Sequence, residues 1–124
     1  MQRVFPTLRI TAYEKSKLFY IDGLGFHIDW EHRFEPHLPV FMQITRDGMS
    51  LFLSQHSGDC HVGGAVYFFI DDVDQWHRSF LQHGVHPEKP LQNTSYGLRE
   101  MCVVDPDGNR LRFGTNLKNG APEI

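Results

Sequence analysis

The sequence contains the same hairpin signal twice, at a separation of 60 residues. Asp47-Gly48 and Asp107-Gly108 each stand between two runs in which apolar and polar residues alternate. An Asp-Gly pair in this setting is typical of a tight β-hairpin. Three further matches keep a separation of 60 or 61 residues: 7–10 with 67–70, Phe19 with Phe80, and Gly23 with Gly84. Matches in one frame indicate an internal duplication.

Each copy is predicted to form a strand, a helix and three strands. In the first copy, about 1–62, we expect strands at 3–10, 26–32, 40–46 and 49–55 and a helix over 13–22 that ends at Gly23. In the second copy, about 63–116, we expect strands at 64–70, 87–92, 99–104 and 110–115 and a helix over 73–83. Apolar residues recur at helical spacing in 73–83, Asp71-Asp72 suits its N-terminus and Gly84 its end. Residues 117–124 form a tail.

The composition indicates one soluble domain spanning 1–124. The chain is 40% hydrophobic and has a formal net charge of −3, with acidic and basic residues mixed along it. A nucleic-acid-binding surface would show as a basic stripe, so we expect no nucleic-acid partner. No apolar run approaches the roughly 18 residues that span a bilayer, and no signal sequence is recognisable. With only two cysteines, far apart, we expect a cytoplasmic protein.

Residues 31–39 depart from the repeat. Pro36 and Pro39 exclude regular strand pairing, so we expect a loop. A charged and aromatic loop on a rigid sheet is a reasonable place for ligand contacts, and equally a cover for an apolar sheet edge.

Three local motifs carry a family resemblance. They are Phe19-Tyr20-x-x-x-Leu24-Gly25-Phe26, Gly97-Leu98-Arg99-Glu100-Met101 and Asp105-Pro106-Asp107-Gly108-Asn109. Over residues 4–115 the chain resembles the glyoxalase/bleomycin resistance protein/dioxygenase superfamily, also called vicinal oxygen chelate. The resemblance implies an α+β fold in which two tandem βαβββ modules form a U-shaped mixed sheet around a cavity. It also implies helices on the outer face and two chains that pair as a homodimer.

Enzymes of that superfamily hold a divalent metal with four side chains, typically two His and two Glu. Aligned on the motifs, those positions fall on Phe5, Phe52, Ala65 and Arg112. Phenylalanine and alanine have no lone pair to offer, and arginine is a permanent cation. We therefore expect no metal at this site, no cofactor and no catalytic residues.

Alternation along the strands identifies the side chains that face the cavity. Aromatic residues near the cavity mouth and a few polar groups suit an extended, partly aromatic ligand. Alternatively, the aromatic side chains only fill the cavity of the sheet. The candidate ligand-binding residues are Phe5, Thr7, Arg9, Trp30, His32, Phe34, Phe52, Tyr67, Tyr96, Glu100 and Arg112.

The resemblance implies a metal-independent binding protein of the bleomycin-resistance type. Such a protein sequesters an aromatic, antibiotic-like ligand, such as a bleomycin-family drug, in a groove of the dimer. Arg9, Arg112 and the neighbouring Arg110 fit a cationic drug poorly, so an anionic ligand remains open. One alternative is a metal-dependent lyase, isomerase or dioxygenase with a displaced site, using Glu31, His32, His56 or Glu100. Another is a vestigial cavity in a protein whose role is in assembly.

Overall fold

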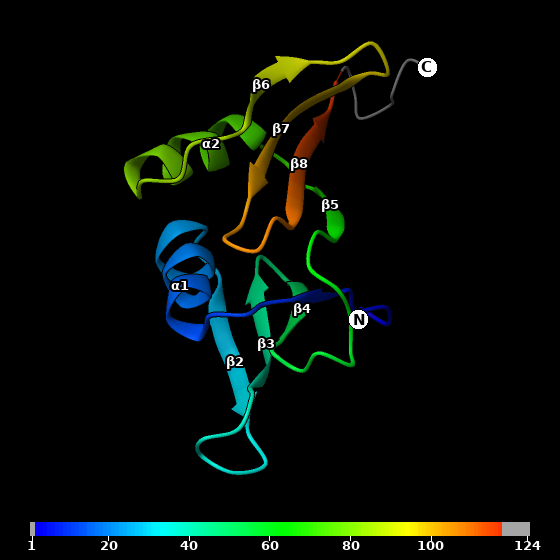
Figure 1. The fold of residues 1–124 in the computed structure, drawn as a ribbon. Coiled ribbons are helices and arrows are strands. Elements are labelled where there is room, and N and C mark those ends of the chain that lie inside the picture. Colours follow the sequence, from blue (N-terminus) through cyan, green and yellow to red (C-terminus); the bar gives the residue numbers. More distant parts are fainter. Residues whose placement is uncertain (1, 118–124) are drawn as a thin grey trace.

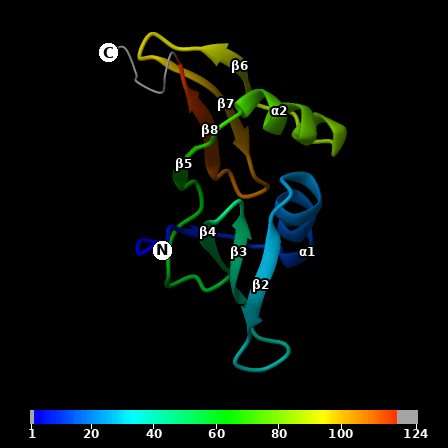
Figure 2. The same cartoon turned by 180° about the vertical axis from the view of Figure 1, so that it is seen from behind.

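The computed structural model describes residues 2–117 and contains the two predicted modules (Figures 1 and 2). In the first module, the helix α1 continues directly as one π-helical segment, η1. Its elements are β1 (Thr7–Arg9), α1 (Tyr13–Lys17), η1 (Leu18–Gly23), β2 (His27–His32), β3 (Phe41–Arg46) and β4 (Met49–Ser54). Those of the second are β5 (Ala65–Phe69), α2 (Val73–Gln82), β6 (Lys89–Asn93), β7 (Leu98–Val104) and β8 (Arg110–Asn116). Of the expected tail, 118–124 lies outside the described residues.

The predicted order of elements is confirmed, but the first strand is shorter than the predicted 3–10. Strand β1 covers only Thr7–Arg9. Pro6 has no amide hydrogen to give to a ladder. Further out, the side-chain amide of Gln2 takes the place of a backbone partner, donating to the carbonyl of Ser50 at 2.9 Å and accepting from its N–H at 2.9 Å.

Each module builds one mixed four-stranded sheet, in the order β1-β4-β3-β2 or β5-β8-β7-β6. The β1–β4 and β5–β8 pairs are parallel and the other pairs are antiparallel. Helices α1 and α2 lie on the same side of the molecule in both views (Figures 1 and 2). The α+β fold with two tandem modules is thus confirmed.

The face of each sheet that meets the helices is the apolar one, opposite to the face with the candidate ligand-binding residues. Leu51 and Leu53 of β4 are buried, and so are Leu111 and Phe113 of β8. Phe113 stacks on Phe68 at a centroid distance of 4.7 Å. Burying each such side chain contributes roughly 1.5–3 kcal/mol, so this shared core supplies most of the stability.

The two hairpins differ by one residue. Asp47 and Gly48 have φ of 49° and 76°, as a two-residue turn between Arg46 and Met49 requires. In the second hairpin the N–H of Asp105 donates to the carbonyl of Asn109, and three residues, 106–108, separate them. Strand β7 is therefore displaced by one position from the 60-residue frame.

A buried hydrogen-bond network joins the modules. The hydroxyl of Tyr20 in η1 donates to the Asp105 carboxylate at 2.6 Å, and burial beside this carboxylate raises the pKa of Tyr20 well above its usual value. The Asn109 side-chain amide donates to the carbonyl of Arg9 at 2.8 Å and accepts from the N–H of Gly64 at 2.8 Å. The hairpin after β7 is thereby fixed to the first module.

A second contact joins the modules on the helix side. The guanidinium carbon of Arg46 lies 3.7 Å from the centroid of the Trp76 ring, and one of its nitrogens donates to the carbonyl of Leu24 at 2.6 Å. Burial lowers the pKa of Arg46. A Cβ at Gly23 would lie 2.6 Å from the Val85 side chain, so the Gly23 backbone packs directly against that side chain.

Helix α2 has the two ends that the sequence predicted. The Asp72 side chain accepts from the N–H of Gln75 at 3.2 Å, and Gly84 has a φ of 81° just after the helix. No helix within residues 2–117 has the length and apolar character needed to cross a membrane.

We predict that Tyr20→Phe lowers the free energy of unfolding by about 1–3 kcal/mol, because a buried carboxylate loses a donor. Urea denaturation measures the change. The matched control is Tyr13→Phe, whose hydroxyl donates to Glu31 at an exposed position and should cost less than about 0.5 kcal/mol. Equal effects of the two variants would contradict the role given to Tyr20.

Candidate functional site

The open face of the first sheet carries four packed aromatic side chains, here called the aromatic face. They are Phe5, Trp30, Phe41 and Phe52. The Phe52 ring is at the centre: its centroid lies 5.0 Å from Phe5, 5.0 Å from Phe41 and 5.9 Å from Trp30. Trp30 remains 41% exposed. The first sheet thus presents an apolar surface of packed rings.

Three of these four residues were predicted and Phe41 was missed. The 60-residue frame pairs Phe41 with Met101, which is buried under the helix. The strand register does not support this pairing of Phe41 with Met101. Gln43 lies opposite Phe52, and Cys102 lies opposite Arg112, so Gln43 corresponds to Cys102. The separation is 112 − 52 = 60 for β4 and β8 but 102 − 43 = 59 for β3 and β7. The extra turn residue concealed the equivalence of Phe41 and Glu100.

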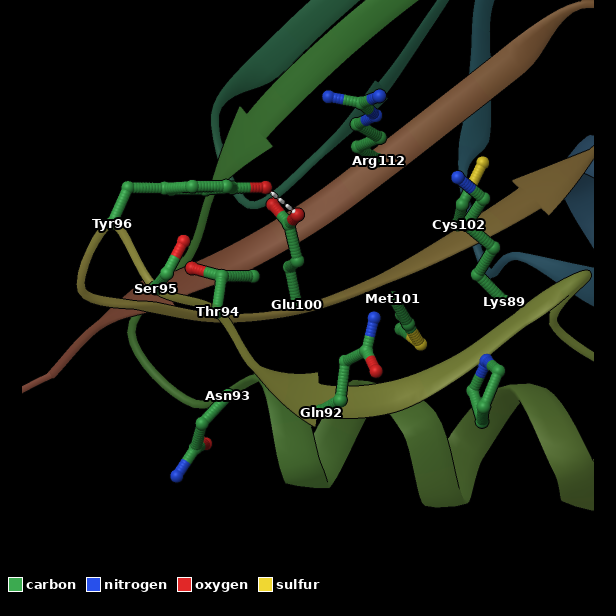
Figure 3. Close-up of a pocket in the computed structure, with 11 residues that line it drawn as sticks. Lys89, Gln92, Asn93, Thr94, Ser95, Tyr96, Glu100, Met101, Cys102 and Arg112 are labelled. Atoms are coloured by element: carbon green, nitrogen blue, oxygen red, sulfur yellow. Dashed lines mark hydrogen bonds between the residues drawn. The ribbon is translucent and has the colours of Figure 1, made fainter.

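On the second sheet, one carboxylate holds two tyrosines, an arrangement called here the phenol clamp. The Tyr67 hydroxyl donates to one oxygen of Glu100 at 2.6 Å. The Tyr96 hydroxyl donates to the other oxygen, as Figure 3 shows. The pKa of Tyr67 is raised mainly by burial and then by the hydrogen bond to Glu100. The pKa of Tyr96 is raised mainly by its hydrogen bond to Glu100. Both phenols therefore keep their protons at neutral pH.

Gly114 makes the phenol clamp sterically feasible. It lies opposite Glu100 in the β7–β8 ladder and beside Phe69 in the β5–β8 ladder. A Cβ built on Gly114 would lie 2.0 Å from the Tyr67 hydroxyl oxygen. The Tyr67 side chain thus lies across the β8 backbone to reach Glu100, and only glycine leaves it room. No pattern in the sequence predicts this contact.

A cavity of about 350 Å³ lies beside the phenol clamp, between β6, β7 and the turn at 94–96 (Figure 3). Its polar lining includes Lys89, Gln92, Thr94, Tyr96, Glu100 and Arg112. An adjoining hollow of about 310 Å³ is lined by Ala65, Tyr67, Arg110 and Arg112. Arg112 faces both, and Lys89 and Arg110 were not among the predicted ligand-binding residues.

The predicted loop residues form a third group. The Phe34 ring stands between two imidazoles, 4.8 Å from the centroid of His32 and 6.2 Å from that of His56. Phe34 is 73% exposed. These three side chains line a shallow hollow with Phe41 and Asp59.

Strand β1 places Thr7 and Arg9 away from the second sheet's cavities. Thr7 lies opposite Phe52, and Arg9 lines a hollow with Cys60 and His61. Burial raises the pKa of the Cys60 thiol. Arg9 and Arg112 therefore line different hollows, on different sheets, and do not form one cationic floor.

The four positions where the superfamily's enzymes hold a metal offer no ligand set. Phe5 and Phe52 stack on each other in the first sheet, while Ala65 and Arg112 belong to the second. A phenyl ring, a methyl group and a guanidinium do not donate to a cation. These residues do not fit a metal.

The residues considered for a displaced metal site do not converge. Glu31 accepts from the Tyr13 hydroxyl, and Glu100 holds the phenol clamp in the other module. The Phe34 ring separates His32 from His56. Within residues 2–117 there is no group of three or more His, Cys, Asp or Glu side chains that could hold a metal ion.

We predict that Glu100→Gln lowers the pKa of both clamped tyrosines toward the ordinary value of about 10. The pKa of Tyr96 should come closer to this ordinary value, because burial continues to raise the pKa of Tyr67. Titration of ¹³Cζ-labelled tyrosine by NMR measures both. Glu88→Gln is the control, since Glu88 pairs with Arg110 and not with a tyrosine; an equal shift in this variant would refute the assignment.

We predict that Gly114→Ala lowers the free energy of unfolding by about 1–3 kcal/mol, because the added methyl group displaces Tyr67 from Glu100. The same variant should lower the pKa of Tyr67. Gly58→Ala is the matched control, because a Cβ at Gly58 meets no atom within 4 Å. Thermal unfolding combined with the tyrosine titration distinguishes loss of the clamp from general destabilisation.

Comparison with known proteins identifies relatives of this fold. A family model described as "Glyoxalase superfamily protein" matches residues 1–121. No match was found among proteins of curated function.

Solved structures of similar fold include proteins that bind antibiotics. TnmS3, described as an antibiotic binding protein from Streptomyces sp. CB03234, has a TM-score of 0.74 and 23% identity, covering 94% of this chain and 97% of that one. A bleomycin-binding protein complexed with bleomycin gives a TM-score of 0.75 and 22% identity, covering 94% and 99%. TioX from Micromonospora sp. ML1 gives a TM-score of 0.76 and 19% identity, covering 94% of this chain and 100% of that one. At these identities the likeness is one of fold.

Proposed function

The chain belongs to the glyoxalase superfamily, and we propose that it is a metal-independent member that sequesters an aromatic, antibiotic-like small molecule. The observation that carries this proposal is the aromatic face, which includes two of the four positions where related enzymes hold their metal. In this chain Phe5 and Phe52 stack there at 5.0 Å. A site that polarises substrate oxygens is thus replaced by a flat apolar surface, suited to binding without chemical change.

The exposure of this surface supports a role in binding. Trp30 on the aromatic face is 41% exposed, and Phe69 on the second sheet is 59% exposed. Large aromatic side chains left open on a rigid sheet indicate a ligand or partner surface. Rings of this kind stack on flat ligands at 4.5–7 Å, as they already do on one another.

The proposal includes a homodimer. In one chain the aromatic face and the phenol clamp lie on two separate sheets, each open on the side away from its helix. A groove with two walls requires a second sheet opposite each open face, and a second copy of the chain would supply one. The bleomycin-binding and antibiotic-binding proteins of the same fold lend support to a small-molecule ligand.

A cytoplasmic location is also part of the proposal. Cys60 and Cys102 are both free thiols, which suits the reducing conditions of the cytoplasm.

We predict that at least one of a panel of aromatic antibiotics, bleomycin included, binds with a Kd below about 100 μM and quenches Trp30 fluorescence. Isothermal titration calorimetry measures the affinity. Trp30→Ala should weaken binding by about tenfold, since stacked aromatic contacts are worth roughly 1 kcal/mol or more each. Leu81→Ala is the control, because Leu81 is 40% exposed on α2, away from the open sheet faces.

Recovery of the bound ligand separates sequestration from catalysis. Mass spectrometry should find the ligand unchanged after incubation, with or without added divalent metals. A modified ligand would overturn the proposal in favour of an enzyme, and failure of every panel member to bind would reject the aromatic-ligand class. If the ligand-free protein sediments as a monomer, the proposal of a binding groove between two chains is wrong.

A further inference from the structure

The cavity beside the phenol clamp contains a row of side chains that crosses three strands. Lys89 of β6 lies opposite Cys102 of β7, and Cys102 lies opposite Arg112 of β8. Strands are spaced about 4.8 Å apart, so the backbones of Lys89 and Arg112 lie roughly 10 Å from each other. Figure 3 shows both side chains on the same side of the sheet as Glu100. Two cations thus flank one cavity.

The two cations are not held in salt bridges with carboxylates of the described part of the chain. Within residues 2–117, Lys89 and Arg112 form no ion pair, whereas Arg110 on the same strand pairs with Glu88. Among the residues that the structure describes, Glu100 is the only carboxylate that lines the cavity, and its two oxygens accept from Tyr67 and Tyr96. Each Glu100 oxygen thus accepts from a tyrosine, and Arg112 forms no ion pair with this carboxylate.

From this arrangement we propose that the cavity binds an oxyanion, a carboxylate or a phosphate, between Lys89 and Arg112. The ligand class of the protein is then an aromatic anion. This inference rests on the proposed binding function and deepens it, because it names the charged group that the ligand must carry. A guanidinium offers paired donors that match the two oxygens of either group, and an ammonium adds a further donor.

The surroundings of the cavity provide for the aromatic part of the ligand. Tyr96 lines the cavity and is 38% exposed. Next to the clamp, the rings of Tyr67 and Phe69 lie 4.8 Å apart, and Phe69 is largely exposed. An acid bound at Arg112 therefore has flat side chains within reach of the ring that bears it. A cationic ligand would meet Lys89 and Arg112 as like charges.

The test compares three ligands of one shape. Calorimetric titrations use 2-naphthoate, 2-naphthyl phosphate and the neutral 2-naphthamide with the wild-type protein. We expect one or both anions to bind at least about tenfold more tightly than the amide, and this preference to fall with added salt. The carboxylate and phosphate arms show which oxyanion is preferred.

Variants assign the preference to the two cations. Arg112→Gln and Lys89→Gln should each reduce anion affinity about five- to tenfold and leave amide affinity within about twofold. The matched controls are Arg78→Gln on α2 and Lys15→Gln on α1, both exposed and distant from the cavity lining.

The outcomes separate this inference from the function on which it rests. Equal binding of the anions and the amide overturns the inference and leaves the proposed function standing. Loss of preference in the control variants also overturns it, because the effect is then one of overall charge. No binding of any naphthyl compound up to about 1 mM overturns the inference as well, and the antibiotic panel then decides the proposed function independently.

Discussion

The arrangement of the two modules depends on one buried carboxylate. Asp105 is 4% exposed and accepts four hydrogen bonds, from the Tyr20 hydroxyl, the N–H groups of Asp107 and Asn109, and the Asn109 side chain. A charge taken out of water is tolerated only when its acceptor sites are filled in this way. The donors come from both modules, so the network forms only when the η1 segment and the β7–β8 hairpin are in register. The direction in which each open sheet face points follows from that register.

Much of the fold could be predicted from the sequence, because the duplication provides two readings of each element. The paired Asp-Gly turns, the glycines after the helices and the alternating apolar residues gave the element order and both helix-facing surfaces. The site was harder to predict. A turn with one additional residue displaces β7 from the repeat, and this concealed Phe41. The relation between Gly114 and Tyr67 depends on a side chain lying across a neighbouring strand, which no pattern within either strand encodes.

The structure also changes the meaning of the predicted site residues. The sequence suggested one cavity with a mixed aromatic and cationic lining. Instead four aromatic residues gather on the first sheet around Phe52, whereas the second sheet combines the tyrosines of the phenol clamp with the cations around Arg112. Duplicated strands have thus diverged toward different chemistry at equivalent positions, because Phe52 and Arg112 are 60 residues apart in the same frame. Phe52 on β4 and Arg112 on β8, which align with metal ligands of the superfamily's enzymes, carry the clearest difference between the modules.

The phenol clamp has a consequence for the thermodynamics of binding. A free tyrosine on a sheet surface samples several rotamers, and ordering such a side chain on a ligand costs roughly 0.5–1.5 kcal/mol. Glu100 holds Tyr67 and Tyr96 in one orientation before any ligand arrives, and Gly114 leaves Tyr67 the space to remain there. The conformational entropy of these two side chains is therefore lost when the chain folds and not when a ligand binds. A ligand that stacks on these rings meets a rigid surface, so its affinity reflects contact enthalpy and desolvation with little offset from side-chain ordering.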